Sequence, residues 1–74
     1  TYKLNIYPNP SRGEVFLDAA DSRVSMGAVY SVLGKKLGEL VPGMNKLQLP
    51  AGMYIVVFLD RNNVALSSER LIIQ

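Results

Sequence analysis

Hydrophobic residues recur along this chain in short segments that have the spacing of β-strands. Near the start, Tyr2, Leu4 and Ile6 alternate with Lys3 and Asn5, which is the period of a strand with one buried face. Similar segments follow at short intervals and are separated by turns rich in Gly, Pro and Asn. These further segments are residues 14–18, 24–32, 36–41, 44–49, 53–59, 64–66 and 69–74. No segment shows the sustained 3.6-residue period of an amphipathic helix.

Two of the segments are apolar on both faces. Residues 53–59 are apolar throughout, rich in β-branched residues, and bounded by Pro50-Ala51-Gly52 and by the polar residues 60–63. This composition predicts a central strand with at least one face in the main core. Residues 24–32 are also apolar on both faces, and Gly27 within them indicates a bulge or a close approach of two backbones.

About seven short strands with a turn every 8–12 residues are typical of an all-β sandwich. We therefore expect an immunoglobulin-like antiparallel β-sandwich, with residues 53–59 in the middle of one sheet. A chain of 74 residues forms one domain at most. It starts in a strand-like segment and has no initiator Met, so we expect residues 1–74 to be a single domain excised from a longer protein.

The composition excludes several kinds of catalytic and metal site. The chain has no His and no Cys, so it cannot build a Ser-His-Asp or Cys-His arrangement or a classical zinc site. Its acidic residues are scattered, which disfavours a pair of catalytic carboxylates. Residues 60–63 have the residue types of calcium ligands but lack the spacing and the glycine of a calcium-binding loop. We expect no enzyme activity, no metal and no cofactor.

The charges give no sign of a nucleic-acid surface. Eight Lys and Arg residues against six Asp and Glu residues leave a net charge of +2, and the longest basic run is the pair Lys35 and Lys36. Nucleic-acid binding usually needs a clustered basic face, so we expect no nucleic-acid partner. No apolar stretch approaches the ~18 residues of a transmembrane helix, so we expect no direct membrane insertion.

Four motifs occur in a fixed order along the chain. The first is Tyr7-Pro8-Asn9-Pro10 followed by Gly13, and the second is Val29-Tyr30-Ser31-Val32-Leu33-Gly34-Lys35-Lys36-Leu37. The third is Leu49-Pro50-Ala51-Gly52-Met53-Tyr54-Ile55-Val56, and the last is the apolar terminal segment Arg70-Leu71-Ile72-Ile73-Gln74. This order resembles the type A C-terminal sorting domain of the type IX secretion system (the Por system) of Bacteroidota.

Members of that family typically have a YPNP-x-x-G opening, an IYDLxGK-like centre, an LPAGxY-like segment and a short apolar strand at the very end. The resemblance covers nearly the whole chain. The chain departs from the family pattern at three positions: Ser31 stands where Asp or Asn is common, Gly27 where an apolar residue is usual, and Gln74 where Lys is frequent.

The resemblance implies that the domain is a secretion signal. It would direct a covalently linked passenger through the periplasm and across the outer membrane, so that the passenger is secreted or held on the outer-membrane surface. The implied partners are the outer-membrane translocation machinery and a sortase-like peptidase. This peptidase would remove the domain near or before Thr1, and the passenger is commonly attached to an anionic lipopolysaccharide. The domain would be a substrate of that reaction and not its catalyst.

The motifs supply the candidate residues for recognition by these partners. They are Pro8, Asn9, Pro10, Gly13, Gly34, Lys35, Gly52, Tyr54, Arg70, Leu71, Ile72, Ile73 and Gln74. Each also has a purely structural interpretation: the prolines stiffen a strand exit, the glycines fit turns, and Tyr54 packs at the edge of the core. If residues 70–74 lie at a sheet edge, their backbone would offer a template for strand addition by a partner.

One alternative function is an accessory β-sandwich module that binds carbohydrate or packs beside a catalytic domain. Sugar-binding sandwiches usually display exposed Trp or Tyr platforms. This chain has no Trp, and its four Tyr residues fall mostly at strand positions, which favours the sorting role.

Overall fold

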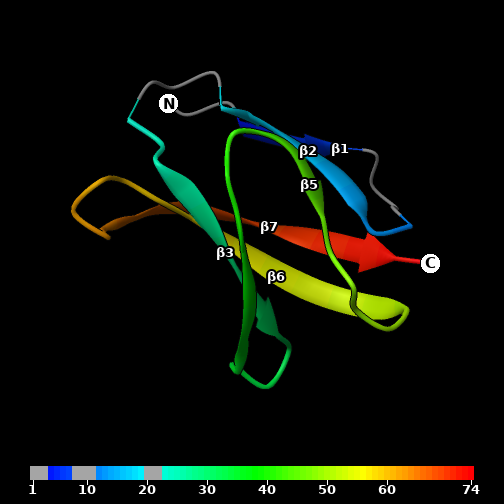
Figure 1. Cartoon of the computed structure of the whole chain (residues 1–74). Helices are drawn as coiled ribbons and strands as arrows, with labels where there is room; N and C mark the ends of the chain where they lie inside the picture. Colours follow the sequence, from blue (N-terminus) through cyan, green and yellow to red (C-terminus); the bar gives the residue numbers. More distant parts are fainter. Residues whose placement is uncertain (1–3, 8–11, 20–22) are drawn as a thin grey trace.

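The alternating segments form β-strands that pair into two antiparallel sheets, as the computed structural model shows for residues 4–7, 12–19 and 23–74 (Figure 1). Within these residues the strands are β1 (Leu4–Tyr7), β2 (Glu14–Ala19), β3 (Met26–Ser31), β4 (Lys36–Leu40), β5 (Gly43–Lys46), β6 (Gly52–Leu59) and β7 (Ala65–Ile73). The strand order is β1-β2-β5 in one sheet and β4-β3-β6-β7 in the other. The predicted all-β sandwich is confirmed, and its immunoglobulin-like subclass stays a prediction.

The core lies between the two sheets. Ile6, Val15 and Leu17 of the three-stranded sheet pack against inward-facing residues of the four-stranded sheet. On that side the buried residues include Val29, Leu40, Val56, Phe58 and Leu71. Aliphatic side chains and the rings of Phe58 and Tyr54 therefore fill the space between the layers, and their burial is the main force that holds the sheets together.

Strand β6 takes the central position that its composition predicts. It pairs with β3 on one side and with β7 on the other. Gly27 of β3 lies opposite Phe58, and a Cβ atom at this position would come within 3.1 Å of Val56 Cγ1. The atoms close to Gly27 belong to the Val56 and Leu40 side chains and not to a backbone, and the register shift between β3 and β4 falls between Val29 and Tyr30, so neither indicated feature lies at Gly27 itself.

The largest differences from the expected boundaries are in β7 and β5, and β3 is also shorter, covering residues 26–31 of the expected 24–32. Residues 64–66 and 69–74 were expected as separate segments, but the structure joins them into β7, because the backbone of residues 65–73 stays paired with β6. Strand β5 ends at Lys46 and not at residue 49. The Leu47 N–H still donates to the Gly13 carbonyl at 2.7 Å, but Gly13 has φ +107°, so the pairing with β2 stops there and the chain leaves for the other sheet. Leu47 and Leu49 still pack against the core.

Two connections are stabilised by side chains that bond to the backbone. At the turn from β4 to β5, Asn45 Oδ1 accepts from the Val41 N–H at 2.9 Å and Asn45 Nδ2 donates to the Val41 carbonyl at 2.8 Å. In the β6–β7 hairpin, Asp60 Oδ1 accepts from the N–H groups of Asn62 and Val64. The residue types that suggested calcium ligands thus serve this hairpin turn.

Candidate functional site: one end of the sandwich

The sequence motifs meet at one end of the sandwich, which we call the motif end. Strand β3 finishes opposite the start of β6, since Ser31 pairs with Tyr54, and β7 finishes there too, since Gly52 pairs with Ile73. In the other sheet, Glu14 at the start of β2 pairs with Lys46 at the finish of β5. The motif end therefore comprises Gly13, the 31–35 hairpin, the 47–54 corner and residues 71–74 (Figure 1).

The 47–54 corner is anchored inward by Tyr54. This side chain is only 7% exposed, and its hydroxyl donates a hydrogen bond to the Pro50 carbonyl. Gly52 has φ +157°, and a Cβ atom built on it would lie 3.9 Å from Tyr54 Cε2. A tyrosine at the start of a strand whose hydroxyl bonds back to the preceding corner recurs in immunoglobulin-type sandwiches, and it is the feature that favours this subclass here.

Gly13 is fixed by a close contact between backbones. Its φ is +107°, and a Cβ atom would lie 2.7 Å from the Leu47 carbonyl oxygen. Any other residue would meet both backbone strain and a steric clash at this position. The glycine that closes the first motif therefore joins the β1–β2 connection to the corner, which is a structural role.

The 31–35 hairpin points its apolar side chains outward. The Gly34 N–H donates to the Ser31 carbonyl at 2.9 Å, and Gly34 has φ +92°. Ser31 Oγ accepts from the Lys35 N–H at 3.1 Å, which is a bond that an Asp or Asn side chain also makes. The turn holds Val32 at 60% exposed and Leu33 at 94% exposed.

The terminal strand alternates between the core and the surface. Leu71 and Ile73 are buried, whereas Ile72 is 44% exposed and pairs with Met53, which is 46% exposed. Arg70 and Gln74 are exposed as well. Strand β7 is the last strand in the order β4-β3-β6-β7, so the terminal segment does lie at an edge of its sheet.

The motif residues thus divide into two groups. Gly13, Gly34, Gly52, Tyr54, Leu71 and Ile73 build the end, and Lys35, Arg70, Ile72 and Gln74 are displayed on its surface. Pro8, Asn9 and Pro10 lie outside the described residues. Sequence reasoning missed Val32, Leu33 and Met53 as displayed residues. Leu33 and Met53 each stand directly beside a turn glycine. An apolar residue in that position is often held away from the core by the turn, and this pattern could have predicted that both are exposed.

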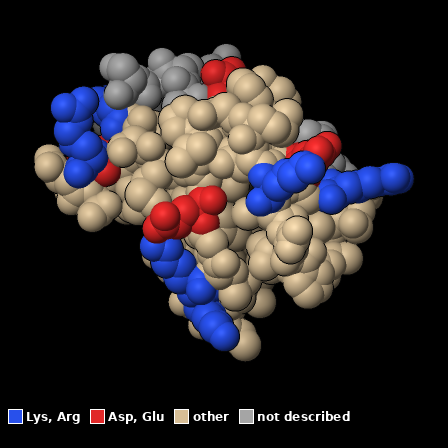
Figure 2. All heavy atoms as spheres, in the orientation of Figure 1, with Lys and Arg blue, Asp and Glu red and all other residues tan. Residues whose placement is uncertain are grey.

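Charges at the surface are scattered and paired locally. Figure 2 shows the Lys and Arg side chains of the visible face in separate groups, with large uncharged areas between them. The Lys36 ammonium donates to Glu39 Oε2 at 2.7 Å, and this hydrogen bond is the main cause that raises the pKa of Lys36. Burial raises the pKa of Glu69, and a hydrogen bond from the Ile6 N–H partly offsets this rise.

The described residues contain no group of three or more acidic side chains that could hold a metal ion. Within the same residues, no helix is long and apolar enough to cross a membrane. The geometry therefore defines a small β-sandwich whose motif residues support and display one end of the fold.

The particular family follows from a comparison with protein families. Residues 5–74 match the family described as the secretion system C-terminal sorting domain, so the chain belongs to that family. Domains of this family are the C-terminal sorting signals of type IX secretion, and the family is not a catalytic one. Comparison with curated proteins gave no match. The sorting role implies a secreted or outer-membrane-surface protein that contacts the secretion machinery and carries a passenger domain.

Proposed function

We propose that the motif end is the surface by which the type IX machinery recognises this domain. The observation that carries the proposal is the 94% exposure of Leu33 at the same end as the terminal strand. Hydrogen bonds already fix the backbone of this hairpin, so a partner that buries the Leu33 side chain has little backbone ordering left to supply. Lys35 and Ile72 extend the same surface.

The steps around this recognition follow from the family role. The domain is one unit of residues 1–74 at the end of a longer secreted chain, and its passenger travels through the periplasm before it crosses the outer membrane. A sortase-like peptidase then removes the domain near or before Thr1. The domain is the substrate of that peptidase, and it contributes no catalytic group.

The structure changes how the proposal has to be tested. Deletion of residues 70–74 would remove Leu71 and Ile73 from the core, so a loss of export could simply reflect unfolding. Point variants at exposed positions avoid this problem. Leu33→Ser and Ile72→Ser change the displayed surface, and Val64→Ser is a matched control, because Val64 is 54% exposed in the β6–β7 hairpin at the opposite end.

The experiment measures export of a reporter fused to the 74-residue domain, in cells with the type IX system intact and in cells with it disrupted. We expect the Leu33→Ser and Ile72→Ser double variant to reduce export about fivefold or more, with the reporter retained in the periplasm. Val64→Ser should export normally, and thermal unfolding should show that all variants fold. Normal export of the folded double variant would refute the proposal.

A further inference from the structure

The outer face of the four-stranded sheet carries an apolar stripe that the sandwich core does not use. It follows the two central strands, β3 and β6, which are the segments that the sequence makes apolar on both faces. The stripe consists of Met26, Ala28 and Tyr30 of β3 and Met53, Ile55, Val57 and Leu59 of β6. The described part of the chain forms two layers and places no third layer over this face (Figure 1).

Strand pairing orders the stripe and its flanks into rows. One row runs Glu39, Ala28, Val57 and Ser68 across β4, β3, β6 and β7. The next row runs Lys36, Tyr30, Ile55 and Arg70. In these two rows, apolar residues occupy the two central columns and polar or charged residues the two outer columns, whereas farther along the face Ile72 of β7 lies beside Met53. Within the stripe Met53 is 46% exposed and Ala28 is fully buried, and the others are half-buried: Met26, Tyr30, Ile55, Val57 and Leu59. A contiguous apolar face that no layer covers often marks an interaction surface.

We propose that this stripe binds the same stripe of a second copy of the domain. A twofold axis that runs across the strands, between the two rows, places each strand antiparallel over its own copy. Lys36 of one copy then faces Glu39 of the other, and this occurs twice. Along β6, Ile55 of one copy faces Val57 of the other, whereas along β3 the contact comes from Tyr30, because Ala28 is already fully buried. The face is therefore complementary to itself, as an isologous interface requires.

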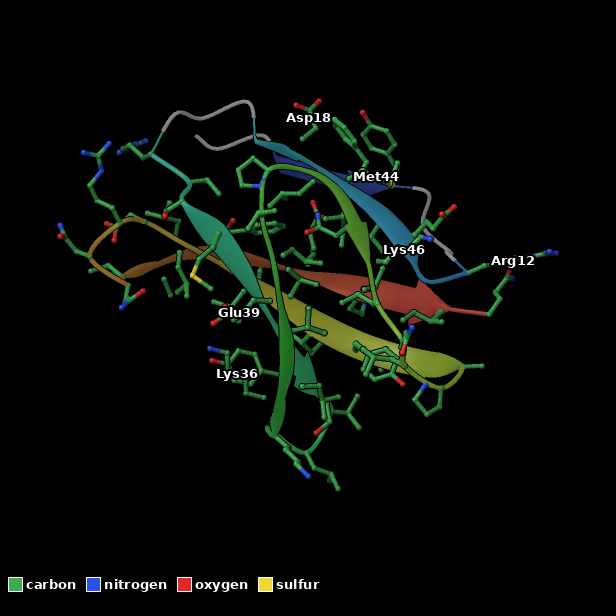
Figure 3. All side chains as sticks on the ribbon, in the orientation of Figure 1. Arg12, Asp18, Lys36, Glu39, Met44 and Lys46 are labelled. Carbon is green, nitrogen blue, oxygen red and sulfur yellow. The ribbon has the colours of Figure 1, made fainter. Side chains whose placement is uncertain are left out.

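The charges favour the twofold axis that runs across the strands over a twofold axis that runs parallel to them. A twofold axis parallel to the strands would place β4 over β7 and bring Lys36 opposite Arg70, which are like charges. Figure 3 shows Lys36 and Glu39 on the same side of β4, and their side chains are 2.7 Å apart within one copy. In the proposed pair, the four side chains from both copies form one group of alternating charge at the edge of the stripe.

The outer face of the three-stranded sheet does not have this self-complementarity. Tyr7, Phe16 and Met44 form one row there, with Asp18 in the row on one side and Glu14 with Lys46 in the row on the other. A twofold axis across these strands would bring Asp18 opposite Glu14 of the second copy. Figure 3 shows Met44 and Asp18 on the outer side of this sheet. This outer face serves as the control surface for the experiment below.

The pair should be weak. About a dozen side chains on each copy meet in it, roughly half the number in a standard interface. The twist between packed sheets also lets their ends diverge, which leaves the Leu33 tip outside the contact. We therefore expect a dissociation constant in the micromolar to millimolar range. Local concentrations of this size are reached when many copies gather at one surface.

Analytical ultracentrifugation of the 74-residue domain across this concentration range tests the proposal. We expect a monomer–dimer equilibrium in which Lys36→Glu or Glu39→Lys alone raises the dissociation constant about tenfold, and the double exchange restores it. Both positions are exposed, so the fold should survive. Glu14→Lys and Lys46→Glu, the matched changes on the other sheet, should have no effect. A monomer at all concentrations, or a dimer indifferent to Lys36 and Glu39, would overturn the proposal.

Discussion

The 47–54 corner and the 31–35 hairpin are two turns at the same end of the sandwich, and they use similar residues for opposite purposes. Each has a glycine with positive φ beside a large side chain. At the corner, Tyr54 turns inward, is 7% exposed and bonds to Pro50. At the hairpin, Leu33 turns outward and is 94% exposed. Similar motif residues therefore stabilise the fold at the 47–54 corner, whereas at the 31–35 hairpin they place an apolar side chain in solvent.

The largest expected effect is a difference in the free energy of unfolding between substitutions at the 47–54 corner and at the 31–35 hairpin. Tyr54→Ala removes a buried aromatic ring and its hydrogen bond, and we expect a loss of about 3–5 kcal/mol, enough to unfold much of a domain this small. Leu33→Ala should change the free energy of unfolding by less than about 0.5 kcal/mol, because the side chain is already in water. Denaturant unfolding followed by circular dichroism measures both. Equal losses at the two positions would contradict the division into support and display.

A smaller effect isolates the hydrogen bonds of the two turns. Tyr54→Phe keeps the ring and leaves the Pro50 carbonyl without its hydroxyl partner, for an expected loss of about 1–2 kcal/mol. Ser31→Ala removes the acceptor of the Lys35 N–H and should cost about 0.5–1 kcal/mol, because this group can bond to water instead. Ser31→Asp should restore stability, since its carboxylate can accept the same bond. A larger loss at Ser31 than at Tyr54 would reverse the comparison.

The smallest effect is a pH dependence at the middle of β7. Burial raises the pKa of Glu69 in the folded state above its value in the unfolded chain, so the folded protein favours the protonated form. The contribution of Glu69 is therefore fully present below the ordinary titration range of glutamate and is lost as the pH rises through the raised pKa. Unfolding curves between pH 3 and 7 should show this decline in the native protein and a flatter profile in Glu69→Gln. An unchanged profile in the variant would assign the pH dependence to other carboxylates.

Local features of the fold could be predicted from the sequence because their causes are local. The alternation in residues 2–6 predicted β1, since side chains in a strand point alternately to its two faces, and the uniformly apolar run 53–59 predicted β6. Boundaries were less predictable where a distant partner sets them. Strand β5 stops at Lys46 because its partner β2 begins only at Glu14, after Gly13 with φ +107°, and nothing in residues 44–49 alone shows where that partner begins.

The sequence predicted which residues belong to the candidate site. It did not predict which of them are buried in the fold and which are exposed to a partner. The order of motifs resembles the family that the comparison shows, and the structure places the described candidate residues toward one end. Whether a given residue is buried or displayed depended on register. In the terminal strand, Leu71 and Ile73 face the core and Ile72 faces solvent, and a shift by one residue would exchange them.

The sequence by itself determined the strand-rich composition, the turns, the absence of His and Cys, and the ordered motifs of a sorting domain. Only the tertiary structure brought the motifs to one end and left Leu33 at its tip, with the β3–β6 stripe on an outer face. The physical reason is that propensity and periodicity act over a few neighbouring residues. Sheet order, by contrast, is fixed by pairing between segments far apart in the chain, which no local pattern specifies.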